Sequence, residues 1–282
     1  MRFIIRLSCV LLLLQVCSSL PFGSRTTKKA GEEEEENPPD SSSSSGNEKV
    51  SLSSVRGAAS KISKSKEEFA TSPIVETFFQ SPLGLGAVES EISNSLKETI
   101  HKLSNTKEMH EFLQATRRSL HRKPELMYEL PFTSETIQTI LDELGIQYTS
   151  GWAKNTHQDV YPGAGGYGIV AHIGTGQEDQ PCIILRADMD ALPIVEATEG
   201  IDPFKSSTPG KMHACGHDGH VTMLLGAAAL LKKVEKEIEG TVRLVFQPAE
   251  EGGAGMKRMV EEGIVDLQPK AQYAFGMHVW PT

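Results

Sequence analysis

The chain has 282 residues, enough for one large domain or two small ones, and its composition is ordinary for a soluble protein once about the first hundred residues are set aside. Its 37 acidic residues outnumber its 28 basic ones and give a net charge of −9, which argues against a nucleic-acid partner. Outside the apolar N-terminal segment the cysteines are Cys182 and Cys215, too few for a disulfide framework.

The first element in chain order is a predicted secretory signal at residues 1–19. A basic start precedes an apolar centre at residues 10–14, and the small residues Ser18 and Ser19 follow it. Because the apolar run is too short to span a bilayer, we expect a cleaved leader, with an uncleaved anchor as the alternative. The sequence therefore predicts a secretory destination, the endoplasmic reticulum lumen or the extracellular space, and no membrane attachment after cleavage.

Residues 20–105 are biased and polar, with a glutamate run at residues 32–36 and a serine run at residues 41–45. Large apolar residues are few in this segment and show no clear period. Such a segment buries too little apolar surface to offset the entropy of ordering it, so we predict a disordered extension. The folded part is expected at residues 106–282.

Two helices are predicted at the start of the folded part. Thr106 is the expected N-cap of a helix at residues 107–121, where apolar side chains recur at helical spacing. Residues 133–136 carry further cap-forming side chains ahead of a second helix, which Gly145 ends.

Strands and helices alternate after this point. We expect strands at residues 168–173, 181–186, 241–247 and 271–279, and helices at residues 219–234 and 254–262. The apolar run in the second of these strands is unbroken, which is typical of a strand covered on both faces. The alternation predicts an α/β sandwich.

Residues 212–220 hold three histidines, one cysteine and one aspartate. Cys215 and His217 are two residues apart, so a turn or an extended segment can direct both side chains at one cation. A thiolate and an imidazole are suitable ligands for Zn²⁺ and related divalent metals. The alternatives are a polar loop that caps the next helix, and a Cys182–Cys215 disulfide that would consume the proposed ligand.

Further candidate site residues lie at or near the ends of the predicted strands. Asp188 and Asp190 come at the carboxyl end of the second strand, where open α/β sheets build their sites, and turn capping is the alternative role. Glu250 and Glu251 follow the third strand, and an ordinary surface pair is the alternative there. His278 lies inside the fourth strand. Thiolate, imidazole and carboxylate groups in this arrangement are typical of a hydrolase.

Two adjacent glutamates can divide the work of amide hydrolysis between them. Neighbouring side chains on a strand or turn point in different directions, so one can ligate a metal while the other reaches the water. A divalent metal lowers the pKa of bound water and polarises the carbonyl group. The second carboxylate accepts the proton of the water and hands it to the leaving amine.

Four motifs resemble those of the aminoacylase/carboxypeptidase-type metallopeptidase family, and most of all those of its plant auxin-conjugate (indole-3-acetic acid–amino acid, or IAA–amino acid) hydrolases. They lie at residues 186–193, 212–220, 247–253 and 276–281. Residues 120–126 also match the first helix and turn of that branch. The resemblance covers the chain from about residue 106 to its end.

The resemblance implies roles for particular residues. It implies that Glu250 is the general acid/base and that Asp190 orients a metal ligand. The implied ligands are Cys215, His217, Glu251 and His278. The family holds two metal ions, with manganese (Mn²⁺) preferred in this branch, whereas the thiolate alone suggests zinc (Zn²⁺). The neighbouring side chains that we do not assign as ligands are His213, Asp218 and His220.

The resemblance also implies a fold and a reaction. The fold is a three-layer α/β sandwich with a mixed central sheet, of which this chain carries the N-terminal part of the catalytic domain. The reaction releases a free acid, such as indole-3-acetate, and an amino acid from a small N-acyl amino acid. Nothing in residues 105–282 identifies an indole pocket, so jasmonate conjugates and other N-acyl amino acids stay open as substrates.

The chain departs from the family pattern at its end. Family members continue past the strand that carries His278 into a satellite domain used for dimerisation, and then supply a final histidine ligand. Because this chain stops at Thr282, we expect a fragment, a truncated gene model or a splice product that lacks the dimerisation domain. Two other hypotheses are an inactive remnant that partners a full-length relative, and a structural zinc module built on Cys215 and His217.

Overall fold

The computed structural model describes residues 96–201 and 203–280. The predicted signal at residues 1–19 and most of the predicted extension lie outside the described residues. One part of the extension is described, and there the prediction of disorder is wrong: helix α4 covers Leu96–Ser104. Ile100 and Leu103 are buried on its inner face, so this short stretch does have apolar side chains that pack against the core.

Helices α5 (Lys107–Arg122) and α6 (Pro131–Glu143) follow. The Thr106 hydroxyl accepts a hydrogen bond from the backbone N–H of Met109, which confirms the predicted N-cap of α5. Helix α6 begins before the predicted cap residues 133–136. Pro131 stands in its first turn, where a missing N–H costs nothing, and the Glu125 carboxylate accepts the backbone N–H groups of the next two residues.

Five strands form one mixed sheet in the order β1-β2-β4-β3-β5. Strands β1, β2 and β4 are antiparallel neighbours, whereas β3 is parallel to both β4 and β5. The strands are β1 Gln147–Lys154, β2 Gly165–Gly174, β3 Cys182–Asp188, β4 Thr241–Gln247 and β5 Ala271–Gly276. Strand β1 was not predicted from the sequence, and the other four were.

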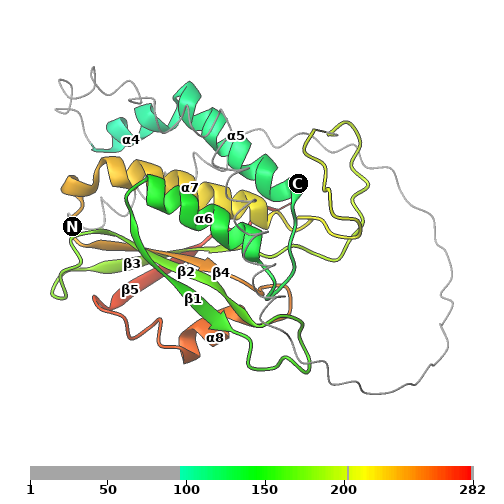
Figure 1. The fold of residues 1–282 in the computed structure, drawn as a ribbon. Helices are drawn as coiled ribbons and strands as arrows, with labels where there is room; N and C mark the ends of the chain where they lie inside the picture. Colours follow the sequence, from blue (N-terminus) through cyan, green and yellow to red (C-terminus); the bar gives the residue numbers. More distant parts are fainter. Residues whose placement is uncertain (1–95, 202, 281–282) are drawn as a thin grey trace, which may run out of the picture.

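Helices cover the sheet on both faces, as the sandwich prediction required (Figure 1). Helix α7 (His217–Lys233) packs with α5 and α6 on one face, and every residue of α7 from its start to Leu231 is buried. Helix α8 (Gly255–Glu261) lies on the other face, where Met259 joins a smaller apolar cluster with Tyr128 and Val245. A short 3-10 helix covers Glu235–Glu237. Among the described residues no helix is both long and apolar enough to cross a membrane.

Two predictions about the parallel strands need correction. Strand β3 is fully covered on one face only, because Ile184 and Arg186 are partly exposed on the other. Strand β5 ends at Gly276, so His278 lies beyond the strand and not inside it. Because β3, β4 and β5 run in the same direction, their carboxyl ends and the segments that follow them meet at one edge of the sheet.

Candidate metal centre

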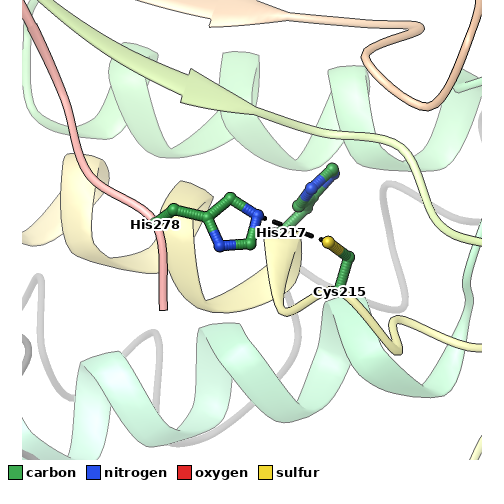
Figure 2. Close-up of side chains that lie close together, drawn as sticks. All are labelled: Cys215, His217 and His278. Carbon is green, nitrogen blue, oxygen red and sulfur yellow. Dashed lines mark hydrogen bonds between the residues drawn. The ribbon is translucent and has the colours of Figure 1, made fainter. Parts of the chain in front are cut away.

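The start of α7 and the segment after β5 bring three of the predicted ligands together. The Sγ atom of Cys215 lies 3.3 Å from Nε2 of His278, and Figure 2 shows both side chains beside His217. One ligand atom from each of the three lies within 4.8 Å of the others. Gly216 between them has a φ of +86°, and a Cβ atom there would lie 2.4 Å from the side chain of Val279. Only glycine fits this approach.

The two glutamates reach the same place from the end of β4. Nε2 of His217 lies 3.7 Å from an oxygen of Glu251 and 3.8 Å from an oxygen of Glu250. Asp190 fixes the backbone of the pair, because its carboxylate accepts the backbone N–H groups of both glutamates at 2.9 and 3.0 Å. It also lies 3.7 Å from Nδ1 of His217. The structure thus brings together the six residues to which the family resemblance gives roles.

The loop that carries the glutamates has a strained backbone. Ala249 and Ala254 both have positive φ, at 53° and 55°, in a region that alanine seldom adopts. The buried Tyr128 hydroxyl donates a hydrogen bond to the carbonyl oxygen of Gly253 at 2.5 Å. Residues in such conformations persist only where their surroundings hold them, and they cluster at functional sites.

Unpartnered polar atoms show that a cation fits this set of residues. Both ring nitrogens of His217 and one carboxylate oxygen of Glu251 are buried, and no described residue forms a hydrogen bond with them. Burying such an atom unpaired costs about 1–3 kcal/mol, so the arrangement is favourable only if something else satisfies these groups. Thiolate, imidazole and carboxylate donors within a few ångströms are ligands for a divalent metal.

The charges around the site also fit a cation. Burial and the neighbouring Glu251 raise the pKa of the Cys215 thiol to about 12, so without a cation this side chain is protonated. Burial alone would lower the pKa of His217, but the nearby carboxylates of Asp190, Asp188 and Glu251 raise it above its usual value. A bound cation would displace the proton from each ligand. Cys182 and Cys215 are both free, so no disulfide consumes the thiol.

A buried ionic network behind the site was not predicted. His121 of α5 lies 2.7 Å from a carboxylate oxygen of Asp218 and 2.8 Å from one of Glu196, and Arg117 lies 2.9 Å from the same Asp218 oxygen. Asp218 directly follows the proposed ligand His217, so the network ties the start of α7 to α5 and to the loop after β3. The sequence indicates this network only through ionisable residues that interrupt otherwise apolar patterns.

A second unpredicted arrangement joins Asp188 to His220. The two side chains are 2.5 Å apart and both are buried. His220 is three residues after His217, so both rings lie on one side of α7, and their centroids are 5.4 Å apart. That helical spacing is a signal that sequence reasoning could have used.

Comparison with known proteins agrees with the site. Residues 184–282 match the model of Peptidase family M20/M25/M40. The chain is 46% identical over 177 residues to IAA-amino acid hydrolase ILR1-like 5 of Arabidopsis thaliana, a match that covers 63% of this chain and 36% of that protein. It is 40% identical over 175 residues to an N-acetylcysteine deacetylase of Bacillus subtilis, with 62% of this chain and 42% of that protein covered.

The chain is also similar to a solved structure from the same family. The YXEP protein of Bacillus subtilis, described as a dinuclear metal-binding peptidase from the M20 family, is 40% identical with a TM-score of 0.53. The match covers 62% of this chain and 44% of that one. The resemblance drawn from the four motifs and the α/β fold are therefore confirmed. The chain spans about two fifths of the length of the curated relatives it matches.

Proposed function

We propose that this chain acts as a metal-dependent amidohydrolase that cleaves the amide bond of N-acyl amino acids, with IAA–amino acid conjugates as its substrates. The observation that carries the proposal is the group of buried, unpartnered atoms of His217 and Glu251, which face the other proposed ligands. The names of the relatives, which include hydrolases and deacetylases of this kind, support the same reaction type.

The proposed ligands divide into overlapping groups that share His217. Cys215 and His278 form one group with it, and Glu251, the proposed ligand at the end of β4, lies in another group beside Glu250. Overlap of this kind supports a site for more than one ion, for which we propose Mn²⁺, with Zn²⁺ as the alternative that the thiolate favours. When bound, the cation supplies Lewis acidity that polarises the amide carbonyl and makes the attacking water more acidic.

Glu250 has the surroundings that a general acid/base needs. Its side chain is 39% exposed, whereas that of Glu251 is 21% exposed and has one buried oxygen. We propose that Glu250 accepts the proton of the attacking water and delivers it to the leaving amine nitrogen. Asp190 holds both glutamates by their backbone N–H groups, so it sets the position of this carboxylate relative to His217.

The other hypotheses have less support. A structural zinc module on Cys215 and His217 has no need of Glu251 or His278, yet both lie at the same place. The inactive remnant is not favoured, because the relatives named above are hydrolases and deacetylases. The secretory destination is a proposal that rests on the pattern of residues 1–19 alone.

The test is release of amino acid from a panel of indole-acetyl, jasmonoyl and N-acetyl amino acids in the presence of Mn²⁺. The 282-residue chain is compared with its Glu250→Gln variant. We expect manganese-dependent turnover that is fastest on the indole-acetyl conjugates and that the variant loses. A soluble, folded chain that binds the metal and releases no amino acid from any substrate would contradict the proposal, as would equal turnover by the variant.

A further inference from the structure

His220 lies between the end of β3 and the segment that follows β5. Its Nδ1 atom is 2.5 Å from an oxygen of Asp188, and its Nε2 atom is 2.9 Å from the backbone nitrogen of Val279. The ring is buried within α7, and its centroid is 4.8 Å from that of His278. The His220 side chain therefore connects the end of β3 with the segment that carries the proposed ligand His278.

The hydrogen bonds fix which nitrogen of His220 carries the proton. A backbone N–H can only donate, so Nε2 must accept from Val279 and cannot carry a hydrogen. The hydrogen of the neutral ring is then on Nδ1, where it is donated to Asp188. Both nitrogens of the ring are thereby engaged within the protein.

This assignment decides between two roles for the residue. Asp188, His217 and His220 lie close enough to form a metal-binding group of their own. However, Nδ1 of His220 has no free lone pair in the ring plane, and the lone pair of Nε2 is taken by Val279. His220 is thus unsuited to be a ligand in this arrangement and suited to hold its neighbours in place.

The segment after β5 needs such a support. The strand ends at Gly276, so pairing with β3 does not extend to His278. Asp188 is itself anchored, because Arg186 donates to its second oxygen at 2.6 Å and to Gln247 at the end of β4 at 2.8 Å. The Asp188–His220 pair is therefore connected to β3 and β4 on one side and to Val279 on the other.

We infer that Asp188 and His220 are positioning residues that hold His278 at the metal centre. The inference rests on the proposed function, because it assigns the pair a role in building that centre. Groups that orient metal ligands typically change metal affinity by about 10–100-fold when they are removed. The pair acts on His278 through the backbone of Val279 and does not touch the metal.

The first test needs no metal. In the unaltered chain the backbone N–H of Val279 is expected to exchange slowly with solvent, because His220 accepts it inside the fold. His220→Phe keeps a ring but removes the acceptor, so exchange at Val279 should become at least about 10-fold faster. His213→Phe is the matched control: His213 is also buried in the same motif, but its ring nitrogens form no hydrogen bond with any described residue. Unchanged exchange in His220→Phe would overturn the inference.

The second test follows Co²⁺ binding by absorption, because a thiolate ligand gives cobalt a charge-transfer band of its own. We expect His220→Phe to lower cobalt affinity by about 10–100-fold, to near that of His278→Ala, while the band from Cys215 persists. An unfolded variant would lose the band as well. Asp188→Asn keeps the volume of the side chain and should show a smaller loss in the same direction.

The outcomes separate the two proposals. If the unaltered chain binds no cobalt, the proposed metal centre is wrong, and so is the positioning role of Asp188 and His220, because it depends on that centre. A different result would overturn only the positioning role. In that case the unaltered chain binds cobalt and His278→Ala binds it weakly, but His220→Phe binds it as tightly as the unaltered chain does.

Discussion

Glu250 and Glu251 are neighbours in sequence with different surroundings, and we propose a different role for each. Glu251 has a buried, unpartnered oxygen and is the proposed ligand, whereas Glu250 is the more exposed of the two. We predict that Glu250→Gln binds Mn²⁺ normally and loses about 10²–10⁴-fold in turnover, the usual contribution of a general acid/base. Glu251→Gln, its matched control, should lose metal affinity. Calorimetric titration and a turnover assay on both variants measure this; the same loss of affinity in both would contradict the division.

Asp190 supports the site through three contacts. Its carboxylate accepts two backbone N–H groups and faces Nδ1 of His217. An asparagine there has one acceptor oxygen, and its NH₂ group would meet an N–H donor. We predict that Asp190→Asn lowers Mn²⁺ affinity by about 10–100-fold and unfolding free energy by about 1–3 kcal/mol. Titration calorimetry and urea unfolding report the two effects, and a variant with unaltered affinity would show that Asp190 does not orient the centre.

For individual residues, the sequence predicted which side chains form the site, but not the contacts that fix their positions. The spacing of Cys215 and His217 identifies them as candidate ligands, and the position of the two glutamates after an apolar strand identifies them as candidate site residues. The Asp188–His220–Val279 connection depends on three segments far apart in the chain meeting at one point. No local pattern encodes that meeting, so it became visible only in the fold.

Among the elements, helix α8 begins in a tightly packed backbone, where Gly255 follows the loop from β4. A Cβ atom on Gly255 would lie 1.8 Å from the carbonyl oxygen of Pro248. We predict that Gly255→Ala lowers the unfolding free energy by at least about 1–3 kcal/mol, the usual cost of overpacking. Gly276→Ala is the control, because the nearest atom to its Cβ would be 3.7 Å away. Urea unfolding compares the two, and equal stability would mean that the loop relaxes freely.

The errors made at the level of elements have physical reasons. Strand β1 lies at an edge of the sheet and is mostly exposed, so it lacks the apolar alternation that identifies a strand. The start of α6 is set by a carboxylate on a preceding residue, Glu125, which a search for local cap residues overlooks. Helix α7, by contrast, contains a long and mostly apolar run from Val221 to Leu231, and its prediction was confirmed to within two residues.

Across the whole molecule, the buried network of His121, Asp218 and Glu196 links the helical layer to the metal-centre loop. Burial alone would lower the pKa of His121, but hydrogen bonds to Asp218 and Glu196 raise it above its usual value. Burial alone would raise the pKa of Asp218, but its hydrogen bond with His121 and the nearby positive charge of Arg117 hold it well below its usual value. Stability from His121 is therefore fully present below about pH 6.5 and is lost as pH rises through its raised pKa. Stability from Asp218 is present above its usual pKa and is lost only in strong acid.

We predict that the cost of His121→Gln depends on pH. The unfolding free energy lost on substitution should be larger at about pH 6 than at about pH 9, because only the protonated imidazole donates to both carboxylates. Urea unfolding of the variant and the unaltered chain at both pH values, with a chelator present, measures the difference. An equal cost at the two pH values would show that His121 is neutral in the fold.

The fold class was predictable because strands and helices alternate along the chain, and a resemblance in four motifs supplied the mixed sheet. The order β1-β2-β4-β3-β5 does not follow from periodicity, since β4 inserts between two strands that precede it in sequence. Sequence patterns indicate which face of each helix or strand is buried. Which strands become neighbours in the sheet depends on tertiary packing.

The most direct test of the proposed metal centre is the metal-edge X-ray absorption spectrum of the zinc-loaded chain, beside that of its Cys215→Ser variant. We predict one sulfur at about 2.3 Å together with nitrogen or oxygen neighbours at about 2.0–2.2 Å, and loss of the sulfur contribution in the variant. A metal surrounded by oxygen alone, or a sulfur contribution that persists in the variant, would contradict the proposed centre.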